Sequence, residues 1–237
     1  MNKVLNDLFD YEDLKIFQYD EGFKFSLDSI LLAEFVELKT TTKLIVDLCT
    51  GNAPIPLILS TKTKAKIYGF EIQKSIYDLA SSSVRENKLH KQIKIVNANL
   101  KDTFEYILPE SVDIVTCNPP YFKCSENSII NQEQEKAIAR HEIEMSLEDL
   151  MISTKYILKN KGTLYLVHRP ERLQEIMNLF NKYNFAVKKM QFIYTSFAKE
   201  SIMVLIKAVK NGAIGMKISP PLNILQYKSY KNIFERN

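Results

Sequence analysis

The amino-acid sequence predicts an α/β fold in which a mostly parallel, seven-stranded sheet ends in a C-terminal antiparallel hairpin. Two observations support this prediction. Short runs rich in β-branched residues alternate with segments of helical periodicity, which indicates a parallel sheet covered by helices on both faces. The last two apolar runs, residues 187–194 and 202–209, have only a short polar stretch between them. Because no crossover helix separates these runs, we expect them to pair as antiparallel strands.

Five further strands precede the hairpin. We predict them at residues 44–48, 66–70, 93–96, 113–117 and 163–167. Helical patterns cover residues 27–36, 75–87, 146–158 and 173–183. Ser146, with Asp149 in the same first turn, is a helix-start signature, and Asn160-Lys161-Gly162 supplies a stop. A mostly parallel sheet closed by a hairpin is typical of the class I (Rossmann-like) methyltransferase fold, whereas a dehydrogenase-type sheet usually lacks the hairpin.

Length predicts a single domain over residues 1–237, which the strand pattern assigns to the methyltransferase fold, and cytoplasmic residence is the default expectation. Residues 1–40 would form an N-terminal extension that contributes to the substrate or cofactor pocket, and residues 210–237 a tail. Hydrophobic residues make up 46% and charged residues 25% of the chain, no apolar run approaches the ~20 residues that cross a bilayer, and no secretory signal is visible. The three cysteines lack a C-x-x-C pair, so neither a disulfide framework nor a metal site is expected.

The strand at residues 44–48 runs into Asp47-Leu48-Cys49-Thr50-Gly51-Asn52-Ala53-Pro54, which opens a helix. In doubly wound folds a nucleotide binds at this position. The usual methyltransferase pattern is D-x-G-x-G-x-G, and here only Gly51 is a glycine, because Cys49 and Ala53 occupy the other two positions. Asp47, Cys49 and Gly51 are therefore candidate binders of S-adenosylmethionine. An ordinary strand-to-helix turn explains the same residues.

The next two strand ends carry further candidates for the cofactor. Glu71 follows the second strand, where an acid can accept hydrogen bonds from both ribose hydroxyls, and Ile72 is beside it. Asn99 and Leu100 follow the third strand and are candidates to hold the adenine amino group and to pack on its ring. The alternatives are an exposed surface glutamate and a simple asparagine turn.

Asn118-Pro119-Pro120-Tyr121 follows the fourth strand and predicts methyl transfer to an amino or amide nitrogen. The lone pair of an exocyclic amine is delocalised into its ring, so the amine is a poor nucleophile. The Asn118 side-chain carbonyl and the Pro119 backbone carbonyl can each accept one N–H, which favours a pyramidal nitrogen aimed at the methyl group. The prolines hold these acceptors rigidly, and Tyr121 offers a face on which a base can stack. Asn118 is expected to face the cofactor as well.

Together these features identify a resemblance to the bacterial tRNA (adenine-N6)-methyltransferases that modify adenine 37, beside the anticodon, of a valine tRNA. The similar stretches are residues 23–33, Asn118-Pro119-Pro120-Tyr121-Phe122, residues 139–142, residues 167–173 and Pro220-Pro221-Leu222. The resemblance covers roughly residues 18–225 and implies S-adenosylmethionine as cofactor and a flipped tRNA adenine as substrate. The departures at Cys49 and Ala53 affect the expected cofactor affinity more than the expected fold.

An RNA substrate suits several polar and aromatic residues outside the tetrapeptide. The candidates for substrate binding are Asp28, Tyr121, Phe122, Arg140, His141, Arg169 and Arg172. The basic members can hold phosphates, and the alternative is a set of solvated charges and intramolecular ion pairs. A net charge of +4 is compatible with RNA but is also an ordinary means to solubility. We assume a monomer, with neither metal nor membrane as a partner.

Other functions remain open at this point. One alternative is glutamine-N5 methylation of a protein, which uses the same tetrapeptide, and guanine-N2 methylation of rRNA and adenine methylation of DNA are others. The protein methylases place a recognition domain before the cofactor motif, and only 43 residues precede Leu44 here. A non-catalytic RNA-binding module with a decayed cofactor site is the alternative of a different class, suggested by the two missing glycines.

Overall fold

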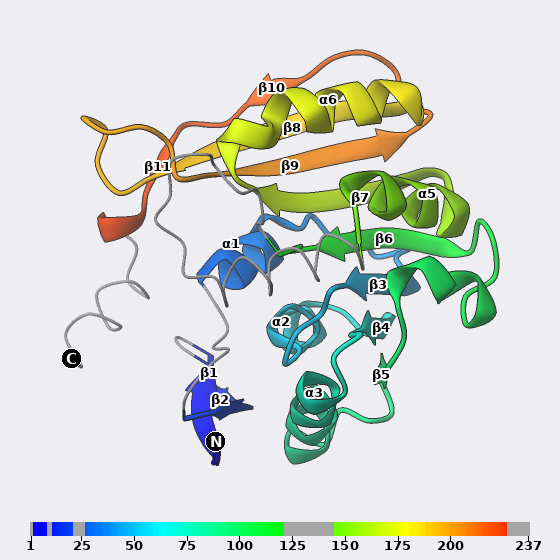
Figure 1. Ribbon diagram of the computed structural model, residues 1–237, viewed down its shortest axis with the longest axis vertical. Helices are drawn as coiled ribbons and strands as arrows, with labels where there is room; N and C mark the ends of the chain where they lie inside the picture. Colours follow the sequence, from blue (N-terminus) through cyan, green and yellow to red (C-terminus); the bar gives the residue numbers. More distant parts are fainter. Residues whose placement is uncertain (1, 9–10, 21–26, 121–144, 227–237) are drawn as a thin grey trace, which may run out of the picture.

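The computed structural model describes residues 2–8, 11–20, 27–120 and 145–226. Seven strands form the body of its main sheet: β3 (Leu44–Leu48), β4 (Lys66–Phe70), β5 (Ile93–Val96), β6 (Val112–Cys117), β7 (Leu158–His168), β8 (Phe185–Tyr194) and β9 (Met203–Lys210). Their order is β8-β9-β7-β6-β3-β4-β5, and β9 runs antiparallel to both of its neighbours (Figure 1). The predicted parallel sheet with a C-terminal hairpin is therefore confirmed.

Two very short strands extend this sheet beyond the seven that the sequence predicts. β10 (Lys217–Ile218) and β11 (Leu222–Asn223) both pair in parallel with β8, which makes the sheet nine-stranded. Pairs of this length leave no periodic signal, so the predicted count of seven was too low. No helix among the described residues is both long and apolar enough to cross a membrane.

Helices cover both faces of the sheet, and a separate apolar cluster fills each side (Figure 1). α1 (Leu27–Phe35) and α2 (Pro54–Lys62) share one cluster, and α5 (Leu147–Ile157) and α6 (Leu173–Lys182) share the other. Strand residues alternate between them: Ile45 belongs to the first cluster and Val46 to the second. Burial of both faces explains why the central strands read as continuous apolar runs. The remaining helical elements are α3 (Lys74–Glu86), η1 (Leu100–Glu105), η2 (Pro170–Arg172) and η3 (Ile224–Gln226).

The start of α5 agrees with the prediction, but its end does not. Ser146 Oγ accepts from the Asp149 backbone N–H at 3.0 Å, and Asp149 accepts from the Ser146 N–H at 2.9 Å, which forms a capping box. The helix then ends at Ile157 because Leu158 already pairs with β6. The predicted stop lies inside β7, where a Cβ at Gly162 would come within 2.9 Å of the Lys159 carbonyl oxygen. This glycine therefore permits a close backbone approach within a strand.

The N-terminal extension contains a two-stranded hairpin that the sequence analysis did not predict. β1 (Lys3–Leu8) and β2 (Tyr11–Tyr19) are antiparallel, and β2 packs on α3. Asn87 binds both backbone groups of Lys15, accepting its N–H at 2.9 Å and donating to its carbonyl at 2.6 Å. Ser83 Oγ accepts from the Phe17 N–H at 2.9 Å. Side chains at the end of α3 thus satisfy backbone groups of β2.

Candidate active site

The carboxyl ends of four parallel strands bring the main candidate residues to one edge of the sheet. Leu48 at the end of β3 pairs with Phe70 of β4 and with Cys117 of β6, and Phe70 pairs with Val96 of β5. The residues that follow these ends are therefore neighbours in space, although they are far apart in the sequence. Among them are Cys49, Glu71 and Asn118.

The loop between β3 and α2 keeps the backbone geometry of a glycine-rich turn without most of the glycines. Cys49, Gly51 and Ala53 have φ angles of 57°, 58° and 74°, all in the left-handed region. This conformation costs an L-residue about 1–2 kcal/mol. The two substituted positions have therefore retained the local conformation, and the surrounding contacts have to offset its cost.

The buried side chain of Asp47 is hydrogen-bonded to this loop. Asp47 is fully buried, and its two oxygens accept hydrogen bonds of 2.6 Å from the Thr50 and Thr116 hydroxyls. Burial raises the pKa of Asp47 to about 7, although both hydroxyl bonds oppose the shift. Gly69 lies opposite Asp47 on β4, and a Cβ there would come within 2.8 Å of Thr50 Oγ1. This geometry favours a positioning role for Asp47, and its direct contact with a cofactor stays a prediction.

Glu71 is buried at the same edge, so the alternative of an exposed surface glutamate is wrong. Only 6% of the residue is exposed. Its carboxylate accepts from the Gly51 N–H at 3.0 Å and from the Gln73 N–H at 2.8 Å. Burial raises the pKa of Glu71, and the bonds from backbone N–H groups oppose that rise. The adjacent Ile72 is 40% exposed. A carboxylate and an exposed apolar side chain thus stand together beside the loop.

Two asparagines follow the end of β5. Asn99 was predicted as a cofactor-binding residue with a turn as the alternative, and Asn97 was assigned no role. Asn99 caps η1, since its side chain accepts from the Lys101 N–H at 3.0 Å, and Leu100 is buried. The Asn99 geometry fits the asparagine-turn alternative, and a cofactor contact stays a prediction. Asn97 donates to the carbonyls of Glu71 and Ile72 at 2.8 and 3.0 Å. It therefore shapes the backbone around the acid. Its position directly after a predicted strand was the available signal.

Asn118 is half-buried after β6 and contacts the N-terminal extension. Its Nδ2 donates to Ser29 Oγ of α1 at 2.9 Å. Pro119 is buried and Pro120 is exposed. α1 thus contacts the tetrapeptide directly, and the contribution of residues 1–40 to a substrate or cofactor pocket stays a prediction. Tyr121 and Phe122 lie outside the described residues.

Two thiols flank the same strand ends. Cys49 is half-buried, and its thiol lies 3.4 Å from the Met145 sulfur. Cys117 is fully buried, and burial together with the neighbouring Cys49 raises the pKa of its thiol. Cys117 is therefore a protonated, apolar part of the core. Within the described parts of the chain, no group of three or more His, Cys, Asp or Glu residues is placed to hold a metal ion.

The basic candidates after β7 already have partners within the protein. Arg169 is exposed and donates to the Ile202 carbonyl at 2.8 Å. Arg172 forms a two-pronged ion pair with Glu175, at 2.9 and 2.6 Å. Phosphate binding by these two side chains stays a prediction. Asp28 lies in the first turn of α1. Arg140 and His141 lie outside the described residues.

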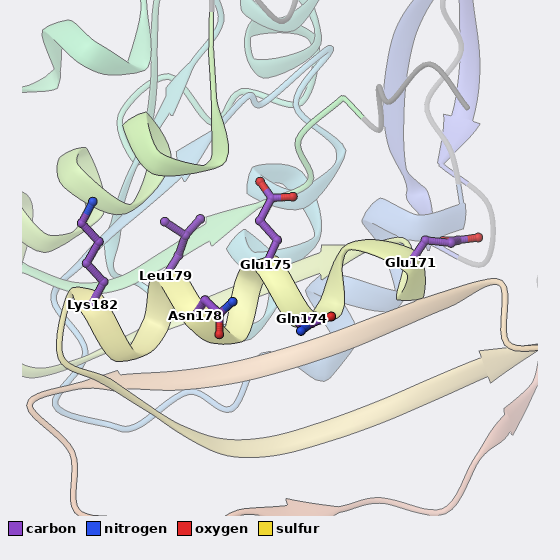
Figure 2. Close-up of a pocket in the computed structure, with 6 residues that line it drawn as sticks. All are labelled: Glu171, Gln174, Glu175, Asn178, Leu179 and Lys182. Atoms are coloured by element: carbon purple, nitrogen blue, oxygen red, sulfur yellow. The ribbon is translucent and has the colours of Figure 1, made fainter. Parts of the chain in front are cut away.

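A surface hollow of about 410 Å³ lies along α6 (Figure 2), and one of its lining residues is Glu175, the ion-pair partner of Arg172. Its lining consists of polar or charged side chains and Leu179, and none of them is a predicted site residue. The full set is Glu171, Gln174, Glu175, Asn178, Leu179 and Lys182. Because all six come from α6 and the turn before it, the hollow is the outer face of one helix and not part of the sheet edge.

The sheet order, the antiparallel β9 and the loops at the carboxyl edge define the class I methyltransferase fold. Residues 24–195 match the family described as methyltransferase small domain, and the chain belongs to this family. Membership supports the expectation of S-adenosylmethionine as the cofactor.

Curated relatives and solved structures agree with this assignment. Proteins named tRNA1(Val) (adenine(37)-N6)-methyltransferase from Cytophaga hutchinsonii and Flavobacterium psychrophilum are each 24% identical to this chain. The matches cover 82% and 86% of this chain and 80% and 87% of those proteins. A protein with the same name from Mannheimia succiniciproducens is 29% identical over 70% of this chain and 67% of its own length.

Two solved structures show the same fold at low sequence identity. A predicted O-methyltransferase from Agrobacterium tumefaciens has a TM-score of 0.66 at 18% identity, over 84% of this chain and 88% of that one. TrmN from Thermus thermophilus has a TM-score of 0.56 at 16% identity, over 77% of this chain and 48% of that one.

Proposed function

We propose that this methyltransferase transfers the methyl group of S-adenosylmethionine to N6 of an adenine in tRNA, with adenine 37 of a valine tRNA as the target. The observation that carries the proposal is the position of Asn118, at the carboxyl end of β6 and beside the loop after β3. The shared name of the curated relatives supports the choice of tRNA and of adenine.

The residues at the sheet edge fit the cofactor. A nucleoside needs an acceptor for its ribose hydroxyls, an apolar surface for its base and a backbone that lets it approach closely. Glu71 supplies the acceptor, Ile72 the apolar surface and the left-handed turn around Gly51 the approach. When bound, S-adenosylmethionine supplies a methyl group made electrophilic by its sulfonium charge.

The role of the protein in the reaction is to present the amine correctly. The Asn118 carbonyl oxygen and the Pro119 carbonyl each accept one N–H of the exocyclic amine, which localises the nitrogen lone pair. Pro119 and Pro120 keep these acceptors in place, so little reorganisation is needed during transfer. The methylated nitrogen is positively charged and acidic, and it releases one proton to water. No base with a raised pKa is required before transfer.

The remaining candidates are assigned to the RNA. We propose that Tyr121 and Phe122 stack on the flipped adenine, and that Arg140, His141, Arg169 and Arg172 hold phosphates around it. Asp28 is assigned to the target base or the cofactor. Binding of tRNA should then weaken steeply as salt is added, because phosphate contacts release counterions.

Asn118→Ala tests the proposal most directly. With purified protein and unmodified tRNA, we expect kcat to fall by about 10²–10³-fold while affinity for S-adenosylhomocysteine stays unchanged, because one preorganised acceptor is lost. Asn178→Ala, on the exposed face of α6, is the matched control and should behave as wild type. Near-normal turnover of Asn118→Ala would refute the mechanism.

Mass spectrometry of the tRNA nucleosides identifies the product. N6-methyladenosine should appear with the wild-type protein and should be missing from tRNA of a strain that lacks it. A product on N2 of guanine would instead favour the guanine-N2 alternative. If the wild-type protein bound no S-adenosylhomocysteine, the non-catalytic alternative would be favoured.

A further inference from the structure

Ser29 is a polar residue on a helix that is otherwise packed into the core. Seven of the nine α1 residues are buried, and Ser29 itself is only 7% exposed. A buried hydroxyl is unfavourable unless it is hydrogen-bonded. Its bond is the one to Nδ2 of Asn118, 89 residues further along the chain. A helix that served only for packing would gain from an apolar side chain at this position.

The bond matters because the two ends of an asparagine amide are chemically different. Only the carbonyl end can accept an N–H from the amine that is to be methylated, whereas the NH₂ end is a donor. Ser29 binds the NH₂ end. Because the amide is planar, this bond turns Oδ1 away from α1. An amide turned the other way would present N–H groups to the N–H groups of the amine.

The two prolines remove a competing use of the same oxygen. Asparagine side chains in turns commonly accept the backbone N–H two residues further on. The residue two positions after Asn118 is Pro120, which has no N–H. This common asparagine turn is therefore not available to Oδ1, and the bond to Ser29 acts on the orientation of the amide.

We propose that Ser29 is a positioning residue for methyl transfer: its hydroxyl accepts from Asn118 Nδ2 and thereby directs Asn118 Oδ1 toward the target amine. The catalytic consequence of the inference rests on the proposed function, and its structural part rests on the hydrogen bond between Ser29 of α1 and Asn118, which follows β6. It also assigns a task to α1, which lies within the N-terminal extension.

Ser29→Ala, Ser29→Thr and Ser60→Ala test this inference together. Ser60 is the matched control, because it is also 7% exposed and its hydroxyl bonds to the Leu57 carbonyl within its own helix at 2.7 Å. We expect kcat to fall roughly three- to tenfold in Ser29→Ala, as for one lost hydrogen bond, while KM for S-adenosylmethionine is unchanged. Ser29→Thr keeps the hydroxyl and should stay within about twofold of wild type, as should Ser60→Ala.

A second readout does not depend on the substrate. In ¹⁵N-resolved NMR spectra, the side-chain amide of Asn118 is identified by its loss in Asn118→Asp. Its two protons should shift and exchange faster with solvent in Ser29→Ala, but not in Ser60→Ala. Unchanged Asn118 amide signals in Ser29→Ala would overturn the structural part of the inference.

The outcomes separate the inference from the proposed function. An active wild-type enzyme with an unchanged kcat in Ser29→Ala overturns the inference, and so does a Ser29→Thr variant as slow as Ser29→Ala. A kcat loss in Ser29→Ala matched by an equal loss in Ser60→Ala overturns it too, since both would then reflect packing. A wild-type protein that methylates no tRNA adenine refutes the proposed function, and the NMR experiment still decides whether Ser29 orients Asn118.

Discussion

Asp47 makes the stability of this protein depend on pH in a direction opposite to that of most carboxylates. Burial raises the pKa of Asp47 in the folded state to about 7, from an ordinary value of 3.8. As pH rises above 3.8, the unfolded chain loses its Asp47 proton first, whereas the folded protein keeps its proton until about pH 7. Asp47 therefore lowers the free energy of unfolding as pH rises through this window, and its effect is constant above it.

The size of the effect follows from the two pKa values. At about pH 8, the shift in Asp47 corresponds to about 4 kcal/mol of lost stability, and at about pH 5.5 to about 2 kcal/mol. In Asp47→Asn the group stays neutral at both pH values, and the Thr50 and Thr116 hydroxyls can rotate to accept from or donate to the amide. The free energy of unfolding of Asp47→Asn relative to wild type should therefore rise by about 2 kcal/mol from about pH 5.5 to about pH 8.

Urea denaturation of wild type and Asp47→Asn at both pH values measures this difference. Asp113→Asn is the matched control. Burial raises the pKa of the Asp113 carboxyl, but the bonds that it accepts, from Lys159 at 2.5 Å and from the Lys43 N–H at 2.8 Å among others, outweigh this effect and lower the pKa. Asp113 thus titrates below the tested range, so Asp113→Asn should cost stability equally at both pH values. If the difference between Asp47→Asn and wild type did not change with pH, Asp47 would be ionised throughout, and the reasoning would be refuted.

Three further predictions concern single side chains. Glu71→Ala should weaken binding of S-adenosylhomocysteine by about 100-fold in calorimetry, because hydrogen bonds to a charged group are lost; unchanged affinity would restrict Glu71 to its bond with Gly51. Burial, aided by the Arg172 charge, lowers the pKa of His168 to about 4, so the free energy of unfolding of wild type relative to His168→Gln should fall by about 2–3 kcal/mol from about pH 7.5 to about pH 4.5. Urea denaturation of both proteins measures this change, and an equal dependence on pH in the two would contradict the assignment. Lys210→Met should lower the free energy of unfolding by about 2 kcal/mol, since Lys210 donates to the Lys155 and Leu158 carbonyls at 2.8 Å; an unchanged melting temperature would count against that role.

The central strands could be predicted closely because both of their faces are buried. The predicted bounds of β3, β4 and β5 agree with the structure residue for residue. The N-terminal hairpin could not be predicted in the same way. Its position depends on side chains such as Asn87 and Ser83, whose contacts with β2 span about 70 residues of sequence. Periodicity reports only which residues face a core, and it carries no information about such contacts.

The residues of the candidate site likewise fall into those that the sequence pattern could predict and those that it could not. Glu71 and Asn118 could be recognised because each directly follows a predicted strand. Ser29, Asn97 and Gly69 were missed, because their roles consist of contacts with residues on other elements. A serine within the apolar pattern of α1 was the signal available for Ser29.

In the loop after β3, hydrogen bonds hold the left-handed backbone conformation that glycines would adopt without steric cost. Each residue from 50 to 53 is held by a hydrogen bond: Thr50 donates to Asp47, the Gly51 N–H donates to Glu71, Asn52 donates to the Phe17 carbonyl, and the Ala53 N–H donates to the Thr50 carbonyl.

Two non-glycine residues in left-handed conformations cost about 1–2 kcal/mol each. The four bonds contribute about 0.5–1.5 kcal/mol each, so their sum is large enough to offset that cost. Three of the four bonds have their acceptors outside the loop, in β2, in β3 and directly after β4, and the fourth lies within the loop. The N-terminal hairpin therefore stabilises the loop after β3 through Phe17 and Asn52. This contact helps to explain why a chain with Cys49 and Ala53 in place of glycines still forms the left-handed turn after β3.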